Sequence, residues 1–214
     1  MNSILDKIAV IKIIPVVVID DENSAVPLAS ALMEAGLPCA EVTFRTNAAK
    51  NAIAKMSKST SDMLIGAGTV LTVNQAKSAV DAGAQFIVSP GISRSVVEYC
   101  LNNAIPVFPG VVTPTEIGLA LEMGLATVKF FPAEESGGIQ YLKAVSAPFG
   151  GMKFIPTGGI NETNVSTYLN FPKVTACGGS WMVKQELIKN GRFDEISAIT
   201  KRAVSLVEGL KNSN

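Results

Sequence analysis

The chain has 214 residues, of which 48% are hydrophobic and 17% charged, and it contains no histidine. Its 18 lysines and arginines balance 18 aspartates and glutamates, so the formal net charge is +0 and nothing predicts a nucleic-acid partner. Without histidine the chain cannot form a Ser-His-Asp triad or the usual zinc sites, and proton transfer must use carboxylate, lysine, tyrosine, cysteine or water.

The cysteines and one apolar segment indicate the compartment. Cys39, Cys100 and Cys177 are odd in number, widely spaced and form no CxxC pair, so we expect small core residues in a reducing compartment. The apolar run 8–19 is interrupted by a lysine and a proline and is too short to span a bilayer. We therefore expect a cytoplasmic protein with no membrane partner, in which this run is a helix end followed by a first strand.

Apolar strands alternate with amphipathic helices along the whole chain. The predicted strands are 13–19, 38–44, 63–67, 85–89, 106–109, 126–131, 153–156 and 174–177. The predicted helices are 24–35, 47–56, 73–82, one from the N-cap Ser93 to 103, 114–123, 139–147, a short helix capped by Asn161, and 193–210.

The number and regularity of these units predict the fold. Eight strand–helix units indicate an α/β protein of the (β/α)8 TIM-barrel type rather than an open doubly wound sheet. Gly36, Gly83 and Gly124 each end a helix just before a new apolar strand, where a left-handed residue is common. No linker or low-complexity stretch divides the chain, so we expect one domain over residues 1–214 with an N-terminal helix.

One lysine lies inside the sixth strand. Residues 126–133 are otherwise apolar, β-branched or aromatic, and Lys129 is the exception. Burial disfavours the ammonium form, so a buried lysine has more free amine near neutrality, and a free amine can attack a ketone to form a Schiff base. The alternative is a lysine whose stem is buried and whose charged head reaches water, and this stretch alone favours that simpler interpretation.

Side-chain alternation places this lysine and a carboxylate at one barrel mouth. In a (β/α)8 barrel the chemistry lies at the carboxyl ends of the strands. Glu41, Thr43 and Arg45 share one face of the second strand. Lys129 and Phe131 share one face of the sixth. A structural ion pair between Glu41 and Lys129 or Arg45 is the alternative, and these residues alone do not decide between it and a catalytic pair.

Glycine-rich turns follow several strands. The segment 66–69 (Gly-Ala-Gly-Thr) lacks the GxGxxG spacing and gives no dinucleotide signal, and the turns at 89–91 and 109–110 have no other feature. Segments 156–160 (Pro-Thr-Gly-Gly-Ile) and 178–181 (Gly-Gly-Ser-Trp) follow the seventh and eighth strands, which is the usual phosphate position in such barrels. Packing turns are the alternative, but two glycine pairs at these positions favour a phosphate site.

These motifs, in this order, make the chain resemble the 2-keto-3-deoxy-6-phosphogluconate (KDPG) aldolases, which often also act on 4-hydroxy-2-oxoglutarate (KHG). The resemblance covers nearly the whole chain and is carried by the following segments: Glu41-Val42-Thr43-x-Arg45-Thr46, Gly66-Ala67-Gly68-Thr69-Val70, Gly83-Ala84-Gln85-Phe86, Ser89-Pro90-Gly91, Lys129-Phe130-Phe131-Pro132-Ala133, Pro156-Thr157-Gly158-Gly159-Ile160 and Gly178-Gly179-Ser180-Trp181. Phe44 stands where many members have leucine, but we expect it to face the helices, away from the chemistry.

The resemblance implies a class I aldolase, a carbon–carbon lyase that uses no metal and no cofactor. Its substrates would be KDPG, cleaved to pyruvate and D-glyceraldehyde 3-phosphate, and KHG, cleaved to pyruvate and glyoxylate. It further implies a homotrimer, with Lys129 as the Schiff-base lysine and Glu41 as the acid–base residue. The implied substrate-binding residues are Arg45, Thr69 and Thr157 around the carboxylate and hydroxyls, Pro90 and Phe131 as pocket walls, and Gly158, Gly159, Gly179 and Ser180 on the phosphate.

Two other functions stay open on the sequence. One is another phosphate-barrel enzyme, an isomerase or decarboxylase, that uses Lys129 without a covalent intermediate. The other is a non-catalytic binder of phosphorylated sugars, in which Lys129 and Glu41 form a static ion pair. Borohydride reduction in the presence of pyruvate separates the first from an aldolase, and ligand binding without turnover would favour the second.

Overall fold

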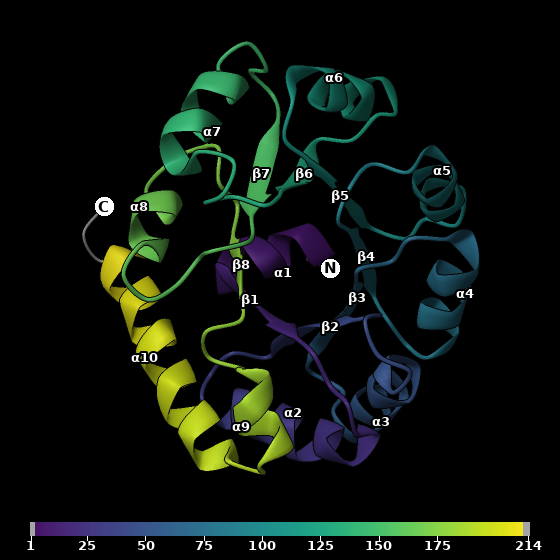
Figure 1. Ribbon diagram of the computed structural model, residues 1–214, viewed down its shortest axis with the longest axis vertical. Coiled ribbons are helices and arrows are strands. Elements are labelled where there is room, and N and C mark those ends of the chain that lie inside the picture. The colour runs from purple at the N-terminus through teal and green to yellow at the C-terminus, as the bar shows by residue number, and fades with distance from the viewer. Residues whose placement is uncertain (1–2, 212–214) are drawn as a thin grey trace.

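The computed structural model describes residues 3–211, and residues 1–2 and 212–214 of the predicted domain lie outside this range. Eight strands form a ring that helices surround (Figure 1). The strands are β1 (Ile13–Val17), β2 (Cys39–Thr43), β3 (Leu64–Gly68), β4 (Phe86–Ser89), β5 (Val107–Val111), β6 (Thr127–Phe130), β7 (Lys153–Pro156) and β8 (Cys177–Gly179). The helices are α1 (Ile4–Ile11), η1 (Glu22–Ser24), α2 (Ala25–Glu34), α3 (Ala49–Ser59), α4 (Val73–Asp81), α5 (Arg94–Asn102), α6 (Pro114–Glu122), α7 (Gly138–Ser146), α8 (Val165–Leu169), α9 (Gln185–Lys189) and α10 (Phe193–Lys211).

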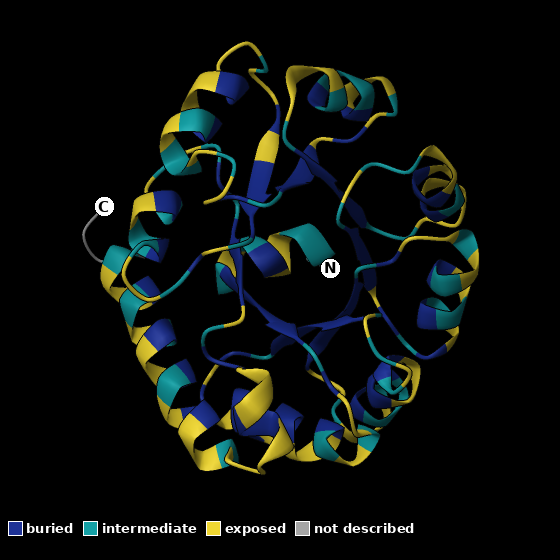
Figure 2. Ribbon diagram, in the orientation of Figure 1, coloured by how far each residue is buried: buried dark blue, intermediate teal, exposed yellow. Residues whose placement is uncertain are grey.

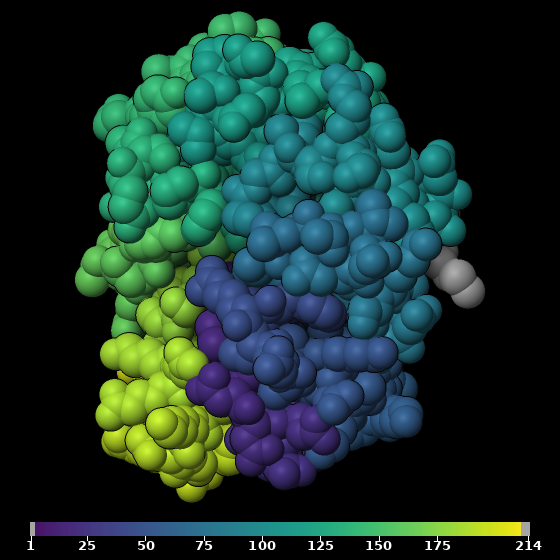
Figure 3. Space-filling model, turned by 45° about the vertical axis from the view of Figure 1, so that its right-hand side comes forward, coloured from purple at the N-terminus to yellow at the C-terminus, as the bar shows by residue number. Residues whose placement is uncertain are grey.

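The strands pair in parallel in the order β7-β6-β5-β4-β3-β2-β1-β8. Two isolated parallel bridges, Phe154 to Val174 and Thr157 to Gly178, join β7 to the β8 segment and bring the ring to closure. Early and late elements lie side by side, because β1 pairs with β8 and α2 contacts α10, and purple and yellow segments meet on the surface (Figure 3). The predicted TIM barrel with an N-terminal helix is confirmed.

Helix ends follow local chemistry. Gly36, Gly83 and Gly124 have φ of 79°, 103° and 80°, the left-handed conformation expected after a helix. At the start of α6, Thr113 and Glu116 form a capping box. Partial burial acts to raise the pKa of Glu116, but hydrogen bonds that its carboxylate accepts from Thr113 and from the Val112 backbone outweigh it and lower that pKa.

The apolar side chains form two cores. Buried residues, in dark blue, run along the ring of strands, whereas the surrounding helices alternate between buried and exposed positions (Figure 2). The larger core lies between strands and helices, and the partly buried Phe44 packs against it, as predicted. The smaller fills the barrel interior and includes Ile8 of α1 with Phe86 and Phe108, whose rings meet edge to face at 6.0 Å between centroids. Helix α1 immediately precedes β1 and lies inside the ring of strands in Figure 1, with Ile8 in this inner core, so it closes the amino end of the barrel and leaves the carboxyl end open.

Most strand and helix ends lie within three residues of the prediction, and four further features differ from it. The eighth strand is Cys177–Gly179 rather than 174–177, and Val174 makes only an isolated bridge. Helix α8 starts at Val165, because Asn161 accepts a hydrogen bond from the Thr163 backbone and stabilises a preceding turn instead of capping a helix. Helix α9 was not predicted, and Ser93 occupies the N-cap of α5 without a side-chain capping bond. Across residues 3–211, no helix combines the length and apolar character that a membrane span requires.

Candidate active site

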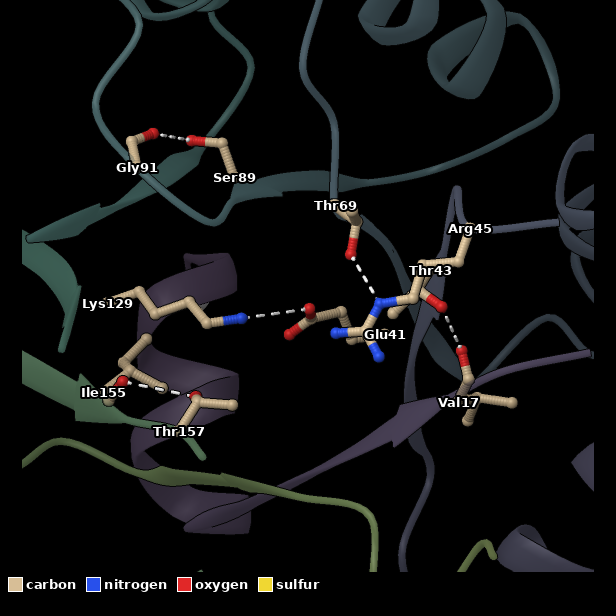
Figure 4. A network of polar contacts seen from close by, with 10 residues as sticks. All are labelled: Val17, Glu41, Thr43, Arg45, Thr69, Ser89, Gly91, Lys129, Ile155 and Thr157. Carbon is tan, nitrogen blue, oxygen red and sulfur yellow. Dashed lines mark hydrogen bonds and ion pairs between the residues drawn. The ribbon is translucent and has the colours of Figure 1, made fainter. Parts of the chain in front are cut away.

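A lysine–carboxylate pair lies inside the barrel. The Lys129 Nζ atom is 3.5 Å from Glu41 Oε1, and the side chains are only 6% and 3% exposed (Figure 4). Lys129 comes from β6 and Glu41 from β2, so the alternation of side chains brings together groups 88 positions apart (129 − 41). The predicted convergence of these two groups inside one barrel is therefore confirmed.

The space for Glu41 depends on a glycine of the neighbouring strand. A Cβ at Gly68 would lie 2.2 Å from Glu41 Oε1, so only glycine leaves the carboxylate in place. The buried Oε1 atom accepts no hydrogen bond from any residue between 3 and 211. A buried oxygen without a hydrogen-bond donor lowers stability unless a ligand or a water donates to it. Such an oxygen can also take a proton from a bound molecule.

Arg45 follows β2 and is held by Thr69. Its Nε donates a hydrogen bond of 3.3 Å to Thr69 Oγ1 (Figure 4). Thr69 has φ of 56°, the left-handed region, which is unusual for a β-branched residue and typically costs about 1–3 kcal/mol. The strained backbone directs the hydroxyl towards the guanidinium, so Thr69 fixes the direction of Arg45.

A cavity of about 640 Å³ opens at the carboxyl ends of β1, β2, β6, β7 and β8. Seven of the predicted site residues line it: Arg45, Phe131, Thr157, Gly158, Gly159, Gly179 and Ser180. The Lys129 ammonium is 4.9 Å from the centroid of the Phe131 ring, so the buried ion pair lies directly beside this cavity. Thr69 and Pro90 are not part of its lining.

The loop after β7 is held from several sides. Gly158 and Gly159 have φ of 98° and 73°, where glycine is favoured. The Gly159 carbonyl accepts hydrogen bonds from Asn161 Nδ2 at 3.1 Å and Asn164 Nδ2 at 3.0 Å. The Gly158 carbonyl accepts a bond of 3.2 Å from the Glu134 backbone. Because these carbonyls are already bound within the protein, the loop has a fixed shape towards the cavity.

Several lining residues were not found from the sequence. They are Val16, Val18, Asn161, Val183, Lys184 and Gln185. Trp181, which was noted only as part of a motif, packs its ring against Gly179, where a Cβ would lie 1.9 Å from a ring atom. The one available signal for Lys184 was its position four residues after Ser180, but a lysine in a turn is usually a solvated surface residue.

The chain is similar to known proteins of one enzyme family. A family model described as KDPG and KHG aldolase matches residues 4–199. The chain is 46% identical over 207 residues to the 2-dehydro-3-deoxy-phosphogluconate aldolase of Treponema pallidum, covering 97% of this chain and 99% of that protein. It is 39% identical over 199 residues to the KHG/KDPG aldolase of Escherichia coli (strain K12), with 93% and 92% covered.

A solved structure matches both the fold and the sequence. It is the KDPG aldolase from Legionella pneumophila, crystallised with pyruvate captured at low pH as a covalent carbinolamine intermediate. The TM-score is 0.90 at 42% identity, and the match covers 94% of this chain and 97% of that one.

Proposed function

Since this chain belongs to the KDPG and KHG aldolase family and is therefore a carbon–carbon lyase, we propose that it cleaves its substrate through a Schiff base on Lys129. The observation that carries this proposal is the buried Lys129–Glu41 pair beside a cavity at the barrel mouth. The substrates are KDPG and KHG, by analogy with the relatives named for these compounds.

The first stage joins substrate and enzyme. The Lys129 amine adds to the C2 ketone, the carbinolamine loses water, and an iminium forms. Its positive nitrogen is an electron sink for the C3–C4 bond. The low exposure of Lys129 limits competing water and keeps the ketone carbon next to the amine.

The second stage breaks the carbon–carbon bond. Glu41, directly or through a water, takes the proton of the C4 hydroxyl as the C3–C4 electrons move to the iminium. The aldehyde leaves, which is D-glyceraldehyde 3-phosphate for KDPG and glyoxylate for KHG. The remaining enamine is protonated at C3, and water then hydrolyses the iminium to release pyruvate and the free Lys129 amine. Each step balances without an external oxidant, metal or cofactor.

The cavity positions the two ends of the substrate. Arg45, supported by Thr69, binds the carboxylate next to the ketone, because a guanidinium can donate two parallel hydrogen bonds to it. Thr157 contacts the substrate hydroxyls, and Phe131 restricts the chain of the substrate. Pro90 lies outside this lining, and its role as a second wall rests on the family resemblance alone. The backbone N–H groups of the loops that contain Gly158, Gly159, Gly179 and Ser180 bind the phosphate.

Borohydride trapping tests this mechanism. Protein mixed with pyruvate and borohydride should gain a three-carbon unit, and peptide mapping should place it on Lys129. A label on Lys143 or Lys153 would exclude Lys129 as the nucleophile. No label together with substrate turnover would favour an isomerase or decarboxylase without a covalent intermediate. A chelator should leave cleavage of both substrates unchanged, because the covalent route uses no metal.

Oligomeric state and compartment belong to the same proposal. We propose a homotrimer, as the family resemblance implies, and sedimentation equilibrium of the purified chain should give three times the 22.4 kDa mass of one chain. We also propose a cytoplasmic location, which is supported by the three cysteines, all of them free and buried.

A further inference from the structure

The cavity carries two charges of the same sign. In the described chain its lining includes two ionised side chains, Arg45 and Lys184, and no carboxylate. Arg45 extends from the end of β2, where Thr69 holds it, and Lys184 follows β8 and immediately precedes α9. A cavity with positive groups from two separate elements favours a ligand with two anionic ends. The function proposed above uses only one of these two cations.

The backbone of Lys184 is fixed on both sides. Val183 is 1% exposed, and the Gln185 side chain donates a hydrogen bond of 2.7 Å to Asp20 on the loop after β1. The Lys184 carbonyl accepts bonds from the backbones of Leu187 and Ile188. The backbone of Lys184 is therefore held in place at the cavity wall, and only its side chain is free to rotate.

The ammonium of Lys184 has no carboxylate partner within residues 3–211. The ion pairs found there use Lys55, Lys129, Arg192 and Arg202 as the cations. The nearby Asp20 carboxylate accepts its hydrogen bond from Gln185, which is neutral. Lys184 is thus available to a ligand, whereas Lys129 at the inner end of the site is already paired with Glu41.

We infer that Lys184 pairs with the phosphate of the bound substrate and determines the preference for phosphorylated over unphosphorylated 2-keto acids. The inference rests on the proposed function. The glycine loops offer neutral N–H donors, which suit any anionic oxygen. A phosphate monoester carries about −1.5 to −2 charges near neutrality, so a cation at the outer end discriminates in its favour. A lysine acts here as a compact point charge that follows the phosphate by side-chain rotation.

The test compares two substrates that differ only in the phosphate. These are KDPG and the same six-carbon 2-keto acid with a free terminal hydroxyl. In Lys184→Gln the ratio of kcat/KM for the phosphorylated over the unphosphorylated acid should fall about 3- to 10-fold, mainly through KM, because an exposed charge pair is weak but the phosphate carries nearly two charges. Lys184→Arg should keep the ratio within about 2-fold, since the charge is retained.

Two controls make the result specific. Lys189→Gln removes an exposed lysine of α9 that does not line this cavity, and its ratio should equal that of the wild type. Inorganic phosphate should inhibit the wild type competitively, and its inhibition constant should rise by the same factor in Lys184→Gln. Higher ionic strength should lower the wild-type ratio and change that of Lys184→Gln less.

The outcomes separate this inference from the proposed function. If wild type and Lys184→Gln both take the borohydride label from pyruvate and the ratio does not change, Lys184 has no role in specificity. An equal fall with both substrates would likewise overturn the inference, since it would indicate a structural role. If the wild type takes no label and cleaves neither acid, the proposed function itself fails.

Discussion

The barrel interior has one layer of side chains at the carboxyl end, the mouth, and another at the amino end, the floor. Both layers are buried, but the mouth contains charged side chains and the floor apolar ones. At the mouth, Glu41 and Lys129 face each other, whereas at the floor Ile8, Phe86 and Phe108 pack together. The same strand supplies both layers, because β2 places Cys39 in the floor and Glu41, two residues later, in the mouth. Two consecutive inward-facing residues of one strand thus belong to different layers, the first to the apolar core and the second to the proposed active site.

The two layers differ in what burial does to free energy. Apolar burial at the floor stabilises the fold by roughly 25 cal/mol per Å². Burial of a charged pair at the mouth costs desolvation energy that the mutual attraction offsets only in part. The mouth is therefore a local cost to stability that the floor and the outer shell of helices compensate. Changes at the mouth should affect the reaction more than folding, and changes at the floor the reverse.

The strongest test of this difference is Lys129→Arg. The guanidinium keeps the charge opposite Glu41 but cannot form the iminium, so turnover should fall to the background rate while the fold is retained. Pyruvate release in a coupled assay and the melting temperature should be measured on the same sample. Lys143→Arg, which changes an exposed lysine of α7, should behave as the wild type. Residual cleavage above one-tenth of the wild-type rate would contradict the assigned role.

Glu41→Gln should have the next largest effect. The amide has the same shape but cannot take a proton, so kcat for aldol cleavage should fall roughly 10²- to 10⁴-fold. The borohydride label from pyruvate should still form, because Lys129 remains. Glu122→Gln, an exposed carboxylate on α6, is the matched control. A kcat close to that of the wild type would mean that water or another residue is the base.

Ile8→Ala probes the floor. Removing buried methyl and methylene groups should lower the free energy of unfolding by about 2–5 kcal/mol, because Ile8 is completely buried in the inner core. The kcat of the molecules that remain folded should change less than 2-fold. Lys7→Ala, on an exposed face of the same helix, should lower stability far less. A large fall in kcat at unchanged stability would show that floor and mouth are not separate.

Ser180→Asp acts at the outer end of the mouth. Ser180 is exposed and lines the cavity, and an aspartate there would remove a donor and repel the phosphate. The kcat/KM for KDPG should fall at least ~10-fold. The reaction of KHG, which has a second carboxylate but no phosphate, should suffer less, so the ratio of the two values is the quantity to measure. An equal fall for both substrates would place the phosphate elsewhere.

The cysteines should show the smallest effect. Burial raises the pKa of Cys100 to about 11, and burial together with the Glu41 charge raises the pKa of Cys39. Burial likewise raises the pKa of Cys177, so at pH 8 all three groups should be neutral thiols. A chromogenic disulfide reagent should react slowly with the native protein and should titrate three thiols after denaturation. Fast reaction of one thiol in the native state would show local opening of the core.

The alternation of strands and helices could be predicted from the sequence, because apolar periodicity and the glycines that end helices are local features of the chain. The alternation of side chains then sufficed to bring Glu41 and Lys129 into one barrel. The predicted eighth strand ended two residues too early, because Gly178 and Gly179 pair with β1 although glycine has low strand propensity. The five-residue helix α9 was missed since it is too short to display a helical period.

Other features of the site depend on geometry that residue type does not encode. The hydrogen bond from Arg45 to Thr69 requires a left-handed threonine, which no pattern predicts. Lys184 lines the cavity because the chain turns there after β8, and its sequence context resembles that of an ordinary surface lysine. The alternation of side chains along a strand therefore predicts which residues face the barrel interior. The loop residues that line the cavity can be identified only from the three-dimensional structure.

The closed floor also determines the order in which products depart. Helix α1 packs Ile4, Leu5, Ile8 and Ile11 against the inner core, so exchange with solvent runs through the mouth. In the proposed mechanism the aldehyde fragment lies between the mouth and the three-carbon fragment held on Lys129, so it must leave before water can reach the iminium. The kinetic scheme is then ordered, with pyruvate as the last product to leave and the first to bind in the direction of condensation. Pyruvate should accordingly compete with the substrate for the free enzyme, whereas the aldehyde should not.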